Sequence, residues 1–411
     1  MTFVSYRIMD LELSRPFAGF ALASHETGYA LVVRWEGRII GFLMKEAPEG
    51  LRMDEEVLRE IVERDFALRI LTVKLEASLM ERWPATTLIE SPSLTIAICT
   101  KDRSARLARL LDALEAIRGA SEFRALEVLV VDNASVDSGT REVVESRADV
   151  RYRFEPKTGL DFARNAALET ATGDLIAYLD DDVVVDRGWL AGLYRVWADC
   201  PDAGGYSGLV LPYRLETPAQ IRFEREGGFG RGFERIHHRG ALLGNPLHPV
   251  GAGVVGAGAN MCFRRDLLLK LGGFDEALDT GAPLPGGGDL DIFYRVLRSG
   301  HAIVYEPRYA VFHEHRETMA QLRRQYWSWG LGFMAFLEKA RRTDPGMRLR
   351  QDAMVRWWFR DKLISFAGAL SALDLRRAGD LAAELRGAIQ GLLGEYDRSL
   401  ARSRRIREQV V

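Results

Sequence analysis

The sequence of 411 residues has little cysteine, no long apolar run and almost no net charge. Cys99, Cys200 and Cys262 are far apart and lack metal-ligand spacing, which favours buried thiols over a disulfide framework or a zinc site. No apolar stretch reaches about 18 residues and charged residues occur near the start, so we expect neither a membrane span nor a signal peptide, and a cytoplasmic chain. A net charge of -2 excludes the basic field typical of nucleic-acid binding.

Residues 1–92 carry the signals of a small α+β accessory domain. Two β-rich runs flank Glu36-Gly37, and a two-residue turn that ends in glycine predicts a hairpin. Asp54 is a good N-cap residue for a helix that follows it. Pro84 and residues 91–93 mark the expected end of this domain, whose role no motif identifies.

Residues 93–317 alternate between strand and helix patterns. The apolar runs lie at 94–99, 127–131, 150–154 and 175–179, and the helical periodicity lies at 106–117 and 161–170. This alternation predicts βαβ units, and therefore an α/β domain around a mixed, mostly parallel, Rossmann-like sheet.

Residues 318–411 are expected to form a helical region. Trp327, Trp329, Trp357 and Trp358 lie within helical patterns. Between Arg341 and the end there are 15 Lys and Arg residues against 9 Asp and Glu, a local net charge of +6. Aromatic and basic residues on helices are typical of peripheral membrane contact, and they also suit ordinary helix packing or a homo-oligomer interface. These alternatives stay open.

The most informative stretch is the apolar run 175–179, which ends in Asp180, Asp181 and Asp182. In open α/β sheets the carboxyl ends of the strands form the edge at which ligands bind. Carboxylates this close repel one another, and a hard divalent cation with oxygen ligands relieves that repulsion. The alternative is a solvated acidic turn.

Other polar residues are expected at the same edge. Thr100 and Asp132 end the first two strands of this region, and Arg164 lies near the start of the helix expected at 161–170. An arginine beside metal-binding carboxylates suits a phosphate-bearing ligand. The alternative for Arg164 is a solvated residue that pairs with Asp161.

Seven motifs follow one another in an order that resembles a known family. They are ICTKDR at 98–103, VVDNAS at 130–135, GLDFARN at 159–165, LDDD at 179–182, GGFDE at 272–276, GGDLD at 287–291 and VFHEH at 311–315. The chain resembles the inverting glycosyltransferases of family 2, such as bacterial polysaccharide and glycolipid glycosyltransferases. The resemblance implies a GT-A-like fold and a metal-dependent transfer of sugar from a nucleotide-diphosphate sugar, with UDP-sugars favoured, to a hydroxyl of a glycan or lipid-linked glycan.

The resemblance also implies roles for individual residues. The donor would contact Thr100, Asp102, Arg103, Asp132, Arg164, Asp180 and Asp181. Asp182 would hold Mn²⁺ or Mg²⁺ with His313 as a late ligand, and His315 is the next candidate. Imidazole suits Mn²⁺ better than Mg²⁺. A histidine after an apolar run is otherwise structural.

On the acceptor side, Asp289 matches the catalytic base of the family's Glu-Asp motif. The Glu before it is replaced by Gly288, which removes one acceptor-side carboxylate. The expected acceptor residues are Asn260, Gly288 and Asp291. Asp291 has an alternative structural role, because it can pair with Arg295 one helical turn later. Asp289 has the alternative role of a helix cap.

Two other functions compete with this interpretation. A sugar-nucleotide pyrophosphorylase has a similar fold, but residues 100–104 lack the glycines of its first loop. A glycan-binding or scaffold protein with a decayed site is supported only by Gly288. The stretch GAGVVG at 251–256 fits G-x-G-x-x-G, but it is not expected to follow a strand and open a helix, as a dinucleotide-binding fingerprint must.

Overall fold

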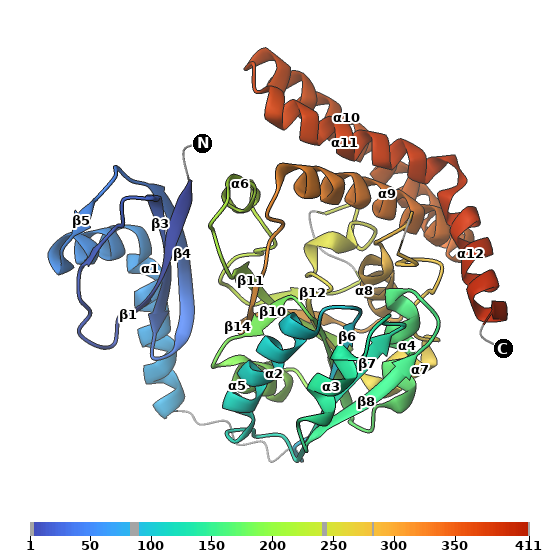
Figure 1. The fold of residues 1–411 in the computed structure, drawn as a ribbon, viewed down its shortest axis with the longest axis horizontal. Coiled ribbons are helices and arrows are strands. Elements are labelled where there is room, and N and C mark those ends of the chain that lie inside the picture. Colours follow the sequence, from blue (N-terminus) through green and yellow to red (C-terminus); the bar gives the residue numbers. More distant parts are fainter. Residues whose placement is uncertain (1–3, 83–89, 241–244, 282, 410–411) are drawn as a thin grey trace.

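The structure, a computed structural model, describes residues 4–82, 90–240, 245–281 and 283–409. Pro84, the expected end of the accessory domain, lies outside these residues. Three regions follow one another along the chain: an N-terminal sheet with one long helix, a central sheet with helices on both faces, and a set of C-terminal helices (Figure 1).

The N-terminal region contains the predicted hairpin and helix. β1 (Ser5–Glu12), β3 (Glu26–Trp35) and β4 (Arg38–Glu46) form a sheet in the order β1-β3-β4, α1 (Glu55–Arg82) follows, and β2 (Phe20–Ala21) pairs with β5 (Arg52–Met53). The hairpin turn has Glu36 at φ 48° and Gly37 at φ 81°, the left-handed backbone that two-residue hairpin turns favour. Asp54 accepts a hydrogen bond from the Val57 amide at 2.9 Å, which confirms the predicted helix start.

Within the described residues the central sheet has nine strands, with the path β10-β14-β11-β13-β9-β6-β7-β8 and with β12 beside β14. Their bounds are β6 (Ser93–Thr100), β7 (Ala125–Asn133), β8 (Val150–Glu155), β9 (Leu175–Asp180), β10 (Val183–Val185), β11 (Gly205–Pro212), β12 (Ile236–His238), β13 (Asn260–Arg264) and β14 (Ile303–His313). The strands β8-β7-β6-β9 are parallel, whereas β13, β10 and β12 run antiparallel to their neighbours. The predicted mixed sheet is confirmed, and its parallel pairs are concentrated where the βαβ pattern is strongest.

Helices cover both faces of this sheet because its strands are apolar on both sides. Ile96 and Ile98 of β6 join one buried cluster, while Ala97 and Cys99 join the other. The helices in contact with the first cluster are α2 (Ser104–Arg118), α3 (Gly139–Glu145) and α5 (Trp189–Asp199). The second cluster includes residues of α4 (Leu160–Thr170), α7 (Arg265–Lys270) and α8 (Gly288–Arg298).

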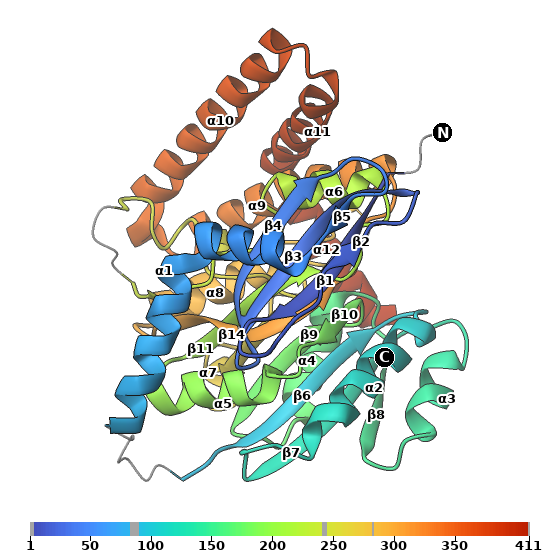
Figure 2. The ribbon, with the colours of Figure 1, turned by 90° about the vertical axis from the view of Figure 1, so that its left-hand side faces the viewer.

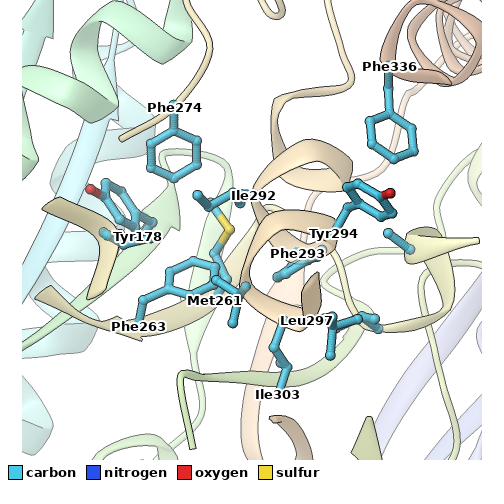
Figure 3. Close-up of a cluster of buried hydrophobic side chains, with 14 of the residues drawn as sticks. Tyr178, Met261, Phe263, Phe274, Ile292, Phe293, Tyr294, Leu297, Ile303 and Phe336 are labelled. Atoms are coloured by element: carbon cyan, nitrogen blue, oxygen red, sulfur yellow. The ribbon is translucent and has the colours of Figure 1, made fainter. Parts of the chain in front are cut away.

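Helix α8 is anchored by its apolar face. Ile292 and Phe293 lie toward Met261 and Phe263 of β13 (Figure 3), and the rings of Phe263 and Phe293 are 5.9 Å apart. All four side chains are fully buried. Because such a close-packed interior resists displacement, the first turn of α8, which contains Asp289, has a fixed position relative to the sheet.

The C-terminal region is helical, as predicted. Its helices are α9 (Met319–Thr343), α10 (Arg348–Ser371), α11 (Leu375–Gln390) and α12 (Tyr396–Gln409), and the shorter α6 (Pro218–Arg225) lies against α9. Helices α10 and α11 form a hairpin that projects from the rest of the molecule (Figure 2). In the part of the chain that the structure describes, no helix combines the length and apolarity needed to cross a bilayer.

A buried ion pair fastens the N-terminal sheet to the central domain. The Arg34 guanidinium of β3 lies 2.6 Å from an Asp186 carboxylate oxygen and 2.7 Å from one of Asp10. Arg34 and Asp186 are both buried. Loss of Arg34 would leave Asp186 as a buried charge without its counter-ion, so the contact fixes how the two sheets meet.

Candidate active site

Strand register gathers the polar strand ends at one edge of the sheet, as predicted. Thr100 of β6 lies opposite Asp132 of β7, and Cys99 lies opposite Asp180 of β9. Strand β10 begins directly after the three aspartates and pairs Val183 with His313 of β14. The antiparallel pairing therefore brings His313 beside Asp182.

Asp181 is held inside the protein by two donors. The Thr100 hydroxyl donates to one of its carboxylate oxygens at 2.7 Å, and the Arg103 guanidinium donates to the other at 2.8 Å. Burial raises the pKa of Asp181, although Arg103 opposes that shift. This aspartate joins β6 and the start of α2 to the acidic edge.

Asp132 and Asp102 hold two neighbouring loops together. Asp132 is buried and accepts hydrogen bonds from the Tyr152 hydroxyl at 2.8 Å and the Ser135 amide at 3.2 Å. Burial and the bond to Asp132 raise the pKa of Tyr152 to about 12. The Asp102 carboxylate accepts from the Val136 amide at 2.7 Å, while its own amide donates to Ser135. The loop after β7 is thus fixed against the loop after β6.

Arg164 is buried among carboxylates from different parts of the chain. Its guanidinium lies 3.0 Å from Asp161, 3.6 Å from Asp279 and 3.8 Å from Asp180. The predicted pair with Asp161 forms, but the alternative of a solvated arginine is wrong because Arg164 is buried. Burial, opposed by Arg164, raises the pKa of Asp180 to about 7 and that of Asp279 to about 6.

Asp289 lies at the same place, in the first turn of α8. Its carboxylate accepts hydrogen bonds from the backbone amides of Gly258 at 3.1 Å and Leu290 at 2.8 Å. It does not cap the helix, whose N-cap residue is Gly287. A Cβ at Gly258 would lie 3.1 Å from Arg164 and 3.2 Å from Asp289, so the bare backbone lets these two side chains approach each other.

The GAGVVG stretch before Gly258 is not a dinucleotide fingerprint. It contains only the 3-10 turn η1 (Ala252–Val254), with turns before it and β13 after it. The prediction against this motif is therefore confirmed. Close packing explains at least one of its glycines, since a Cβ at Gly256 would lie 2.5 Å from the Ser207 side chain.

Asp291 and Asn260, both expected at the acceptor, have structural positions. Asp291 is buried between Arg295 and Lys339, each at 2.7 Å, which confirms the predicted pair with Arg295. Asn260 is fully buried and donates to the Tyr309 carbonyl at 2.8 Å. Both side chains direct their polar atoms into the protein, which does not fit the predicted contact with an acceptor.

Gly288 marks a place that carboxylates already fill. A Cβ at this position would lie 2.1 Å from Asp161 Oδ2 and 2.6 Å from Asp279 Oδ2. The Gly288 amide donates to that Asp279 oxygen at 2.9 Å. The family's Glu therefore has no space here, and the acidic groups around Asp289 come from α4 and from the loop before α8.

Asp182 and His313 form the pair best suited to a metal ion. The His313 Nε2 atom lies 3.3 Å from Asp182 Oδ1, a buried oxygen without a hydrogen-bond partner. Burial, with His315 and nearby arginines, lowers the pKa of His313 well below 6.5 and keeps its ring neutral. Among the described residues no group of three or more His, Cys, Asp or Glu side chains is arranged around a metal position. Two ligands fit a cation that takes its other oxygens from phosphates and water.

Several residues of this edge were not predicted. Asp279 lies in an irregular segment at φ 50°, where no periodicity indicates which way a side chain points. Asp161 was considered only as a surface partner of Arg164, yet it is fully buried. Glu224 comes from α6, far away in sequence, and lies 2.9 Å from His315. Local pattern carries no signal for such long-range contacts.

Two family models match the chain. Residues 95–238 match the model described as glycosyl transferase family 2, and residues 175–375 match glycosyl transferase family group 2. Together they span the sheet, its acidic edge and the first helices of the C-terminal region. These matches identify the α/β fold, with its polar residues at the carboxyl ends of the strands, as that of a glycosyltransferase. The chain is a member of glycosyl transferase family 2, as its seven motifs predicted.

Individual relatives cover parts of the chain. It is 30% identical over 234 residues to a pre-mycofactocin glycosyltransferase of Mycobacterium tuberculosis, a match to 55% of this chain and 43% of that protein. It is 28% identical over 239 residues to the succinoglycan biosynthesis protein ExoM of Rhizobium meliloti, 57% of this chain and 70% of that one. A mannosyltransferase from Pyrobaculum calidifontis, solved with GDP-Man and Mn²⁺, is 18% identical with a TM-score of 0.48, over 78% of this chain and 94% of its own. The chain spans less than half of the mycobacterial relative.

The crowding at Gly288 predicts a large cost for the smallest added side chain. Gly288→Ala should lower the free energy of unfolding by about 1–3 kcal/mol, since Asp161 is too confined to move away. The control is Gly286→Ala, where the nearest atom would be 3.9 Å away, and its effect should stay within about 0.5 kcal/mol. Denaturant unfolding measures both values, and equal effects of the two substitutions would contradict the packing described.

The burial of Asp279 predicts a pH-dependent gain when its charge is removed. Its pKa of about 6 lies above the ordinary 3.8, so the folded state loses stability as Asp279 ionises with rising pH. The melting temperature of metal-free Asp279→Asn should therefore exceed that of the metal-free parent protein, and the difference should grow between about pH 4 and pH 7. A difference that does not change with pH, or that shrinks as pH rises, would refute the assignment.

Proposed function

We propose that this chain is a metal-dependent, inverting glycosyltransferase that moves a sugar from a nucleotide-diphosphate sugar to a hydroxyl of a glycan or lipid-linked glycan. One observation carries the proposal. Arg164 is a single buried cation that joins Asp180, at the end of the acidic strand, to the carboxylates around Asp289. Donor-side and acceptor-side groups of the family pattern thus meet at one edge. UDP-sugars are the first donors to test.

Asp289 is the proposed catalytic base. Its carboxylate is only partly buried, and the hydrogen bonds that it accepts come from the backbone amides of Gly258 and Leu290. These two bonds orient the group and leave carboxylate lone pairs free to accept the proton of an acceptor hydroxyl. Attack by that oxygen on the side of the sugar opposite the leaving diphosphate inverts the anomeric carbon.

Asp182 and His313 would hold Mn²⁺ or Mg²⁺, with Asp180 assisting. Such an ion, when bound, neutralises charge that develops on a departing diphosphate. Two arginines of this chain contribute at the same place, since Arg103 and Arg316 each lie 3.8 Å from Asp182 Oδ2. Both are more than one third exposed, so guanidinium nitrogens that their carboxylate contacts leave unused can bind phosphate oxygens.

Replacement of the base tests the proposal. Asp289→Asn keeps the hydrogen-bond acceptor but cannot take a proton, so it should retain donor binding and lose sugar transfer by about 10²-fold or more. The assay is release of nucleoside diphosphate from nucleotide sugars with Mn²⁺ present, with donor affinity measured by calorimetry. Pyrophosphate formed from sugar 1-phosphate and a nucleoside triphosphate would instead identify a pyrophosphorylase.

The matched control is Asp291→Asn, two positions later in the same helical turn. This substitution weakens the buried pairs with Arg295 and Lys339, so it should lower stability while folded molecules keep transferring sugar. A parent protein that binds the donor but never turns it over would favour the scaffold alternative. If Asp289→Asn is fully active and folded Asp291→Asn is inactive, the assignment of the catalytic base to Asp289 is wrong.

We also propose that the outer end of the α10–α11 hairpin contacts an anionic membrane, at the inner face, where a lipid-linked acceptor would lie. Leu370, Leu373 and Leu375 are 44%, 82% and 71% exposed there, and Arg376 and Arg377 beside them are exposed as well. Apolar side chains next to basic ones suit the headgroup region of anionic lipid. Trp358 is buried and Trp357 is half exposed, so the predicted aromatic face is only partly available.

Vesicle sedimentation at low salt tests this contact. The protein should bind vesicles that contain phosphatidylglycerol, and Leu373→Asp with Leu375→Asp should weaken binding by about 10-fold or more. The control is Leu349→Asp, which is 84% exposed at the opposite end of α10 and should leave binding unchanged. Absence of binding would contradict the membrane contact, and a loss of self-association in the double variant would point to a homo-oligomer interface.

A further inference from the structure

Behind His313 lies a chain of hydrogen-bonded side chains that nothing in the sequence predicted. Glu224 Oε2 of α6 is 2.9 Å from His315 Nε2, and His315 Nδ1 is 3.1 Å from His313 Nδ1. His313 Nε2 in turn faces Asp182 Oδ1 at 3.3 Å. The side chains of Glu224, His315 and His313 are 7%, 1% and 6% exposed, so water has little access to the chain.

The order of donors along this chain follows from its outer end. The Glu224 carboxylate accepts hydrogen bonds, so the proton of His315 lies on Nε2. With that proton on Nε2, the Nδ1 atom of His315 can accept a hydrogen bond, and His313 Nδ1, 3.1 Å away, is placed to donate it. The Nε2 atom of His313 is left with a free lone pair that faces Asp182.

Asp182 Oδ1 has no hydrogen-bond partner, which agrees with this order of protons. Two electron-pair donors 3.3 Å apart repel each other unless a cation binds both. We infer that Glu224 and His315 are positioning residues that hold His313 in the form whose Nε2 can bind the divalent cation of the active site. The inference rests on the proposed metal role of Asp182 and His313.

The surroundings of the chain restrict its rings. Phe223 packs edge-on against His315 with ring centroids 4.8 Å apart, and Phe229 packs edge-on against His313 at 5.0 Å. A Cβ at Gly228, which has φ 49°, would lie 2.4 Å from Glu224 Oε2. The sharp turn at that glycine therefore leaves room for the carboxylate. Glu314 takes no part, because it pairs with Arg106 and Arg109.

The test combines ring tautomers with metal affinity. In protein labelled with ¹⁵N-histidine and free of metal, long-range ¹H–¹⁵N spectra should show His313 protonated at Nδ1, with His313→Asn identifying its signals. Glu224→Gln should give a mixture, since an amide both donates and accepts. Affinity for Mn²⁺ alone, from the electron paramagnetic resonance signal of the free ion, should fall about 10-fold or more.

Two further variants make the result decisive. Glu226→Gln changes the same residue type on the same segment, but Glu226 bonds Tyr326 and Arg222, so tautomer and affinity should not change. His315→Gln breaks the chain with Glu224 in place and should lower Mn²⁺ affinity as Glu224→Gln does. An unchanged tautomer and unchanged affinity in both Glu224→Gln and His315→Gln, whatever their stability, would overturn the inference. The parent protein could also show His313 protonated at Nδ1 and yet fail to bind Mn²⁺. That result would contradict the metal part of the proposed function, while the hydrogen-bonded chain from Glu224 to His313 would stand.

Discussion

The arrangement of the candidate site depends on one buried guanidinium. Arg164 compensates Asp161 from its own helix, Asp180 from the end of β9 and Asp279 from the loop before α8, and its charge also acts on Asp289. A low-dielectric interior penalises carboxylates without a counter-ion. Asp161, Asp180 and Asp279 can therefore lie together only because Arg164 is among them.

The elements outside the sheet keep that cluster in place. Lys339 of α9 lies 2.7 Å from Asp291, which fixes the helical turn that contains Asp289. The loop with Asp279 is tied to α12, because the hydroxyls of Thr280 and Ser399 are 3.0 Å apart and buried. The C-terminal helices thus belong to the architecture of the site, whatever the hairpin between them contacts. The N-terminal sheet contributes through the ion pair between Arg34 and Asp186, which fixes the residue that follows β10.

The sequence predicted those parts of the site that local pattern encodes. Short apolar runs that change abruptly to polar residues predict Thr100, Asp132 and Asp180 at one edge, because parallel strands must align their carboxyl ends. Asp279 and Glu224 were not predicted, and neither was the burial of Asp161, because these features follow from loop conformation and contacts between distant segments. Asn260 was expected at the acceptor, but its side chain is fully buried and donates to the Tyr309 carbonyl, a long-range contact that no local pattern predicts.

The proposed function requires that a divalent cation held at Asp182 and His313 serves a sugar transfer completed at Asp289. The most direct measurement is the rate of nucleoside diphosphate release from a panel of nucleotide sugars, with Mn²⁺ or with excess chelator. We expect release from at least one donor with Mn²⁺, its loss with chelator, and its return when Mn²⁺ is restored. Equal rates with and without chelator would contradict the claim, and so would the absence of turnover across the whole panel.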